Sequence, residues 1–245
     1  MNKSITVILN GYRRPHTLAA QMEAIKKQTV PPQCVMFWQN KDSEEVFDYS
    51  QLASCIVTVS NANFGVWARF SYALNATTDY VCVFDDDTIP GSKWFENCIN
   101  TIEKKEGLLV ANGITFLDEE YIKYDRYGWV NPNEEIVQTD TGGHSWFFKR
   151  EWLGAFWRDA PLINDKLRIS GEDMHFSYAI QKYLGLPTLV PPHPKDDLEM
   201  WGSNPELAFK YGVDKNAISV NYHTSHFGEA LKLTIKKGFK LLINE

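Results

Sequence analysis

Residues 80–87 read YVCVFDDD, an apolar run that ends in three consecutive carboxylates, Asp85, Asp86 and Asp87. Such an apolar run is typical of a fully buried strand. Three carboxylates at the end of this strand repel one another and lose hydration. The alternative interpretation is an acidic surface turn or a helix N-terminus, but one or two carboxylates would serve there and three are excessive. A hard divalent cation relieves both costs, because it takes oxygen ligands and also binds phosphate oxygens. The segment therefore predicts a buried strand that ends in a metal site for a phosphorylated substrate.

Strands and helices alternate before this segment. Apolar, β-branched runs predict strands at 5–9, 34–38 and 56–59, and apolar residues at helical spacing predict helices at 17–28 and 66–76. This alternation favours an α/β fold with a Rossmann-like, mostly parallel central sheet flanked by helices. Such sheets bind ligands at the carboxyl ends of their strands. We therefore expect one crevice to collect the polar residues that follow the strands, namely Asn10, Gln39, Asn40, Asn63 and the three aspartates.

The second half is less regular. It predicts helices at 93–105, 173–184 and 229–242, strands at 108–116, 135–139 and 146–148, an extended segment at 187–194 and a polar loop at 195–216. Neither an internal repeat nor a linker divides the 245 residues, so a single domain is expected.

Composition excludes some classes of function. The net charge of −6 implies no general affinity for nucleic acid, while 44% hydrophobic and 13% aromatic residues suffice for a sizeable core. The four cysteines form no CxxC pair, which favours a reducing, cytoplasmic location. We expect neither a signal peptide nor a transmembrane segment. The basic, amphipathic tail at 231–242 predicts a packed helix, and a weak contact with a membrane surface is the alternative.

Four motifs in order carry a family resemblance. They are VILNGYRRP at 7–15, NFGVWARF at 63–70, the Asp-x-Asp of Asp85 and Asp87, and GED at 171–173. Together they resemble glycosyltransferases of the GT-A fold, family 2 type, over residues 5 to about 185. The last three also resemble the retaining exostosin-like transferases. The resemblance implies a nucleotide-sugar-binding lobe at about 1–90, an acceptor lobe at about 91–228 and a C-terminal helix at 229–245.

The resemblance also implies a metal. A Mn²⁺ or Mg²⁺ ion would bridge the carboxylates and the donor diphosphate and stabilise the leaving group. Asp87 is implied as a direct ligand, Asp85 as a further ligand or a contact to the ribose or base, and Asp86 as either. Some transferases of this fold take a last ligand from a C-terminal histidine, which makes His223 and His226 candidates. The alternative for both is an ordinary core or surface histidine.

Donor and acceptor contacts follow from the same motifs. Donor-binding candidates are Asn10, Tyr12, Arg14, Gln39, Asn40, Asn63 and Arg69. Arg69 fits a diphosphate, but a surface salt bridge is equally expected. Asp173 is the implied general base, with Glu172 beside it. The alternative is a capping box between Ser170 and Asp173. Residues 142–146, GGHSW, are interpreted as the approach to the acceptor, with Trp146 facing it.

The function expected is therefore a metal-dependent glycosyltransferase that moves a sugar from a nucleoside-diphosphate sugar, a UDP-sugar above others, to a hydroxyl acceptor such as a glycan. Two alternatives stay open: a haloacid-dehalogenase-like phosphatase, whose Asp-x-Asp also ends a strand, and a non-catalytic binder of nucleotide sugars. A nucleic-acid acceptor is a third, which the acidic charge balance disfavours. Inversion or retention at the anomeric carbon also stays open.

Overall fold

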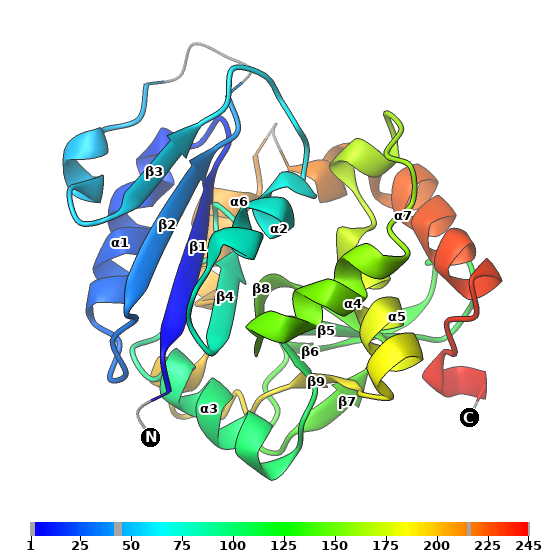
Figure 1. Cartoon of the computed structure of the whole chain (residues 1–245). Coiled ribbons are helices and arrows are strands. Elements are labelled where there is room, and N and C mark those ends of the chain that lie inside the picture. Colours follow the sequence, from blue (N-terminus) through cyan, green and yellow to red (C-terminus); the bar gives the residue numbers. More distant parts are fainter. Residues whose placement is uncertain (1–2, 42–45, 215–216, 245) are drawn as a thin grey trace.

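The computed structural model describes residues 3–41, 46–214 and 217–244, without the side chains of 219–225. Within these residues, one sheet contains the strands β1 Ile5–Gly11, β2 Cys34–Gln39, β3 Ile56–Val59, β4 Tyr80–Phe84, β5 Leu108–Phe116, β6 Tyr124–Gly128, β7 Val137–Thr139, β8 Thr141–Lys149 and β9 Thr188–Val190. Their order is β3-β2-β1-β4-β8-β5-β9-β7, and β6 pairs with β5 (Figure 1). The chain is thus a mixed α/β domain, as the sequence predicted.

The first half of the sheet is parallel. β1 lies between β2 and β4, and β3 forms the edge. All five residues of β4 are buried, as the apolar run predicted. The crossover helices α1 (Leu18–Lys26) and α2 (Ala68–Tyr72) lie on opposite faces, because right-handed crossovers run in opposite directions from the centre of this sheet (Figure 1). The carboxyl ends of β1 and β4 consequently meet at one edge.

The second half is largely antiparallel, so the expected mostly parallel order describes only the first four strands. β8 pairs antiparallel with both β4 and β5, and within this half only β9 runs parallel to β5. For β5 and β6 the physical reason is the length of the connection. Residues 117–123 join these two strands, and a connection this short cannot carry a parallel crossover.

The remaining helices are α3 Trp94–Lys104, α4 Leu153–Arg158, α5 Glu172–Leu184, α6 Pro205–Gly212 and α7 Ile218–Lys236. α4, α5 and α7 pack beside the second half, whereas the end of α6 lies beside the carboxyl ends of β1 and β4 (Figure 1). The sequence interpretation missed α6, although Asn204 caps it by accepting from the Leu207 N–H and Pro205 occupies its first turn.

α7 differs most from the prediction of a helix at 229–242. It starts at Ile218 and ends at Lys236, because Gly238 has a φ of 102° and the Phe239 N–H turns back to the Thr234 carbonyl. Leu231, Phe239 and Leu241 are buried in a second core against α5, so these apolar side chains face protein rather than a membrane surface. Across the described residues, no helix combines the length and the apolar character needed to cross a bilayer.

Candidate active site

A cavity of about 400 Å³ opens at the carboxyl ends of β1 and β4. It gathers most of the polar residues that the sequence singled out. Those that line it are Asn10, Tyr12, Arg14, Asn40, Asn63, Arg69, Asp85, Asp86, Asp87, Glu172 and Asp173. The parallel topology explains this convergence, since strand ends that are far apart in sequence become neighbours. Among the donor-binding candidates, Gln39 is the exception, because its buried side chain accepts a hydrogen bond from the Tyr49 hydroxyl and does not line the cavity.

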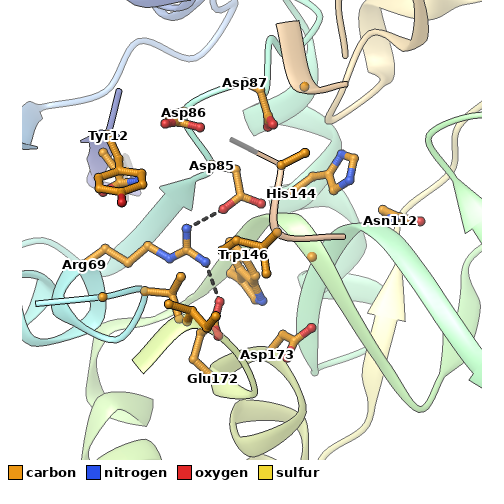
Figure 2. A pocket seen from close by; sticks show the side chains of 18 of the residues that line it. Tyr12, Arg69, Asp85, Asp86, Asp87, Asn112, His144, Trp146, Glu172 and Asp173 are labelled. Carbon is orange, nitrogen blue, oxygen red and sulfur yellow. Dashed lines mark hydrogen bonds and ion pairs between the residues drawn. The ribbon is translucent and has the colours of Figure 1, made fainter. Parts of the chain in front are cut away.

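Arg69 ties two carboxylates together inside the cavity (Figure 2). Its side chain is 5% exposed and pairs with Asp85 through Nη1 and with Glu172 through Nη2, the latter at 2.6 Å. The guanidinium also lies 4.6 Å from the ring centroid of Trp146. The alternative of a surface salt bridge is therefore wrong. Arg69 fixes the start of α5 against the end of β4 and neutralises much of the negative charge between them.

Trp146 supports this arginine rather than offering an open face to a sugar. It is 1% exposed on β8, and Phe70 packs edge-on against it. The expectation that Trp146 faces an acceptor is thus wrong in this respect, although part of its side chain does line the cavity. The cause is the pleat of β8, which turns Trp146 toward the core of the parallel half.

Arg14 is the second buried arginine of the site. Its Nη1 donates to Asp86 Oδ1 at 2.7 Å and to Asp87 Oδ2 at 3.2 Å, and its Nη2 pairs with Asp214 at 2.8 Å. Burial raises the pKa of Asp86 to about 7, and the charge of Arg14 opposes this rise. Arg14 therefore binds the acidic turn itself, which differs from the simple nucleotide contact that the sequence suggested.

Asp87 and Asp85 are the carboxylates suited to a metal. Burial raises the pKa of Asp87, and the charge of Asp85 raises it further, which a cation between them would reverse. Among the described residues, no three His, Cys, Asp or Glu side chains converge as a complete ligand set. Magnesium commonly binds through one or two carboxylates, with substrate phosphates and water completing the shell. The two aspartates fit that chemistry.

The structure gives no support for His223 or His226 as metal ligands. His226 is half-buried on α7, and the described lining of the cavity does not include it. Its neighbour Phe227 lies there instead. The side chain of His223 lies outside the described residues.

Asp173 is the carboxylate without a described ion pair. The capping-box alternative is wrong, because α5 is preceded by Gly171 at a φ of 86° and the Ser170 hydroxyl donates to the Lys166 carbonyl. Asp173 Oδ1 accepts from the Met174 N–H at 2.7 Å. Burial, reinforced by the charge of Glu172, raises the pKa of Asp173 to about 8. With Glu172 held by Arg69, Asp173 is the better placed of the two to exchange a proton.

The opposite side of the cavity, here called the distal wall, is formed by Asn112 on β5, Tyr121 in the following turn, Arg126 on β6 and His144 on β8. Sequence reasoning missed the first three, whereas His144 belongs to the GGHSW segment that was interpreted as the approach to the acceptor. Figure 2 shows Asn112 and His144 on the side away from Tyr12. Burial lowers the pKa of His144, while Asp87 opposes this effect, so the imidazole is neutral near pH 7. The one available signal was the glycine pair before His144. Gly142 packs so closely on β5 that an added Cβ would lie 2.5 Å from the Asn112 carbonyl oxygen.

Comparisons with known proteins give a fold. No family model matches the chain, and neither does any curated protein sequence. Among solved structures, the chain is similar to S. aureus TarS, with a TM-score of 0.53 and 15% identity over 77% of this chain and 35% of that one. A structure of S. aureus TarS 1–349 matches with a TM-score of 0.53 and 14% identity, covering 85% of this chain and 63% of that one.

A third structure, S. aureus TarS 1–349 in complex with UDP, matches with a TM-score of 0.52 and 14% identity over 77% of this chain and 58% of that one. The chain therefore spans between about a third and just under two thirds of the TarS chains that it matches. At this level of identity the likeness concerns the fold alone. This chain has a mixed α/β fold, with a central sheet flanked by helices, that is similar to glycosyltransferase structures.

Proposed function

We propose that this protein is a metal-dependent glycosyltransferase that moves a sugar from a UDP-sugar to a hydroxyl group of a glycan. The observation that carries the proposal is the placement of three carboxylates in one cavity. Asp85 and Asp87 lie at the end of β4, and Asp173, which has no ion pair among the described residues, lies at the start of α5. The similarity to TarS, one structure of which is a UDP complex, supports the choice of donor.

The nucleoside would bind beside the first strand. There Asn40 Nδ2 donates to Asn63 Oδ1 at 2.8 Å, and Asn63 Nδ2 donates to the Tyr12 hydroxyl at 3.3 Å. Asn40 Oδ1 also accepts from the Phe64 N–H at 2.8 Å. These bonds hold three loops in one arrangement. The half-exposed ring of Tyr12 then offers a face for a base.

Asp87 and Asp85 would hold a Mn²⁺ or Mg²⁺ ion, which supplies positive charge for the leaving diphosphate. Arg69 orients Asp85 through an ion pair, and Arg14 orients Asp86 and Asp87 in the same way. The site is thus arranged before the donor arrives, so less reorganisation accompanies the reaction.

On the acceptor side, Asp173 would take the proton of the attacking hydroxyl. Its Oδ1 is occupied by the Met174 N–H, so the second oxygen receives the proton. A raised pKa makes this carboxylate a stronger base than an exposed aspartate. A base in this position implies inversion at the anomeric carbon, which NMR analysis of the product anomer tests.

The central experiment is a thermal-shift screen of nucleotide sugars with and without Mn²⁺. A donor at 100 times its Kd stabilises the fold by about 2.7 kcal/mol, which for a chain of this size raises Tm by roughly 5–11 °C. The rise should require metal and should disappear in Asp87→Ala. The matched control Asp125→Ala, an exposed residue of β6, should keep it. A metal-independent rise would remove the metal from the proposal, and phosphate release without a sugar nucleotide would favour a phosphatase.

A further inference from the structure

Arg126 differs from Arg14 and Arg69, which also line the cavity, in having no acidic partner among the described residues. Arg14 and Arg69 each pair with at least two carboxylates. In the described part of the chain, no carboxylate lies within ion-pair distance of Arg126. Its guanidinium carbon lies 5.1 Å from the ring centroid of Tyr124 and 5.6 Å from that of Trp129. Its Nη2 donates a long hydrogen bond of 3.4 Å to the Tyr124 hydroxyl.

This arrangement holds a cation in place while leaving donors unused. The aromatic faces stabilise the positive charge and restrict the side chain. Most of the five N–H donors of the guanidinium stay available, and their planar fork matches a carboxylate or a phosphate. Arg126 lines the cavity and is half-buried, so a bound anion would meet it in a partly desolvated setting where charge pairing is stronger.

Asn112 adds an independent polar group on the neighbouring strand. It is 4% exposed and lines the same cavity, yet its Oδ1 has no hydrogen-bond partner among the described residues. A buried polar atom without a partner costs stability until something binds it. The side-chain amide both accepts and donates, so a hydroxyl group of a ligand would satisfy it.

Both residues lie across the cavity from the donor carboxylates. The sheet order places β8 and then β5 between β4 and β6. Asn112 on β5 is therefore two strand spacings from β4, or ~9 Å, and Arg126 on β6 is three, or ~14 Å. That span leaves the diphosphate at Asp85 and Asp87 on one side and a second ligand on the other. Asp173 lines the same cavity, within which the two ligands would react.

Resting on the proposed transferase function, we propose that Arg126 and Asn112 form an acceptor subsite for a hydroxylated ligand that carries an oxyanion, either a carboxylate or a phosphate. Arg126 binds the anion, and Asn112 binds a hydroxyl group beside it. Recognition would therefore favour acidic glycans or phosphorylated sugars over neutral ones. The subsite positions the acceptor and takes no part in proton transfer.

The test uses the full chain saturated with UDP and Mn²⁺ and measures binding of three probes by titration calorimetry. The probes are methyl β-D-glucuronide, glucose 6-phosphate and the neutral methyl β-D-glucoside, so the first two separate carboxylate from phosphate. A charge-assisted hydrogen bond predicts that at least one anionic probe binds about tenfold or more tightly than the neutral one. Arg126→Gln should abolish this preference, Arg126→Lys should retain part of it, and UDP affinity should not change in either.

Arg150→Gln is the matched control, because Arg150 is exposed and follows the far end of β8, and it should keep the preference. In the wild type, the preference should also weaken as salt rises, which tests the inference even if a variant fails to fold. Equal binding of charged and neutral probes, or no binding of any probe while UDP binds, would refute the subsite but not the donor site. An Arg126-dependent preference for UDP-glucuronate over UDP-glucose would instead assign the anion to the donor. Loss of UDP binding in the wild type would refute the proposed function itself.

Discussion

Replacing Arg69 with methionine should be among the most damaging single changes in this protein. The arginine pairs with Glu172 at 2.6 Å and with Asp85, and methionine keeps its apolar length without its charge. Asp85 is 27% exposed and can regain water, whereas Glu172 is 8% exposed and cannot. The variant therefore leaves one carboxylate buried and unpaired, for which the expected cost is about 3–5 kcal/mol. In a chain of this size that lowers Tm by roughly 6–20 °C.

The loss of stability in Arg69→Met should depend on pH, and the direction of this dependence follows from the pKa of Glu172. Burial raises the pKa of Glu172 while Arg69 opposes that rise, so losing the arginine raises the pKa further. A group with a raised pKa in the folded state binds a proton that the unfolded chain releases. Stability is then present at low pH and lost as the pH rises. The deficit of Arg69→Met should be larger at pH 8 than at pH 5.

Chemical denaturation at both pH values measures the effect. The double variant Arg69→Met/Glu172→Gln should recover part of the loss, because it removes the stranded charge. Lys27→Met, which breaks an exposed pair with Glu23, should leave Tm unchanged. A loss below about 1 kcal/mol, or the same loss in the single and double variants, would refute the view that Glu172 depends on Arg69.

Three further outcomes are expected. Asp173→Asn should lower kcat by about 10²–10⁴-fold with unchanged UDP affinity, and unaltered turnover would remove Asp173 from the mechanism. Since the pKa of Asp173 is raised to about 8, kcat/KM should increase with pH up to about 8 and then level off, and Asp173→Glu should move that rise. Burial lowers the pKa of His193 to about 4, although the hydrogen bond between its Nδ1 and the Pro191 carbonyl, at 2.7 Å, opposes this change, and its Nε2 accepts from the Gly202 N–H. Stability should therefore fall by up to about 3 kcal/mol between pH 6.5 and 4, and His193→Gln should flatten that slope.

The parallel half of the fold was readable from the sequence because each strand is a dense apolar run. β4 needs burial on both faces, and the carboxylates after it could only lie at its exposed end. The convergence of Asn10, Asn40 and Asn63 with Asp85 then follows from topology alone. In this half, the strands predicted from the sequence pattern fit only one arrangement of the sheet, so the position of the site could be predicted.

The second half was less readable, because its strands are short or mixed in character. β6 reads YDRYG, with charges that conceal the alternation of a strand, and the turn before it is also charged. Arg126 could therefore not be assigned to the cavity. The partners of Arg14 and Arg69 were equally hidden, because they depend on contacts across as many as 200 residues of chain. Side-chain pairing at that separation leaves no local signature.

The position of β8 has a consequence for how the chain is made. This strand comes late in the sequence, yet it fills the place between β4 and β5. Until residue 149 has left the ribosome, one edge of β4 in the nascent chain has no neighbouring strand, and its backbone N–H and C=O groups on that edge are unpaired. A fragment ending near residue 90 would keep that border unprotected and should self-associate. Synthesis must therefore run well past the midpoint before either half is safe from misassembly.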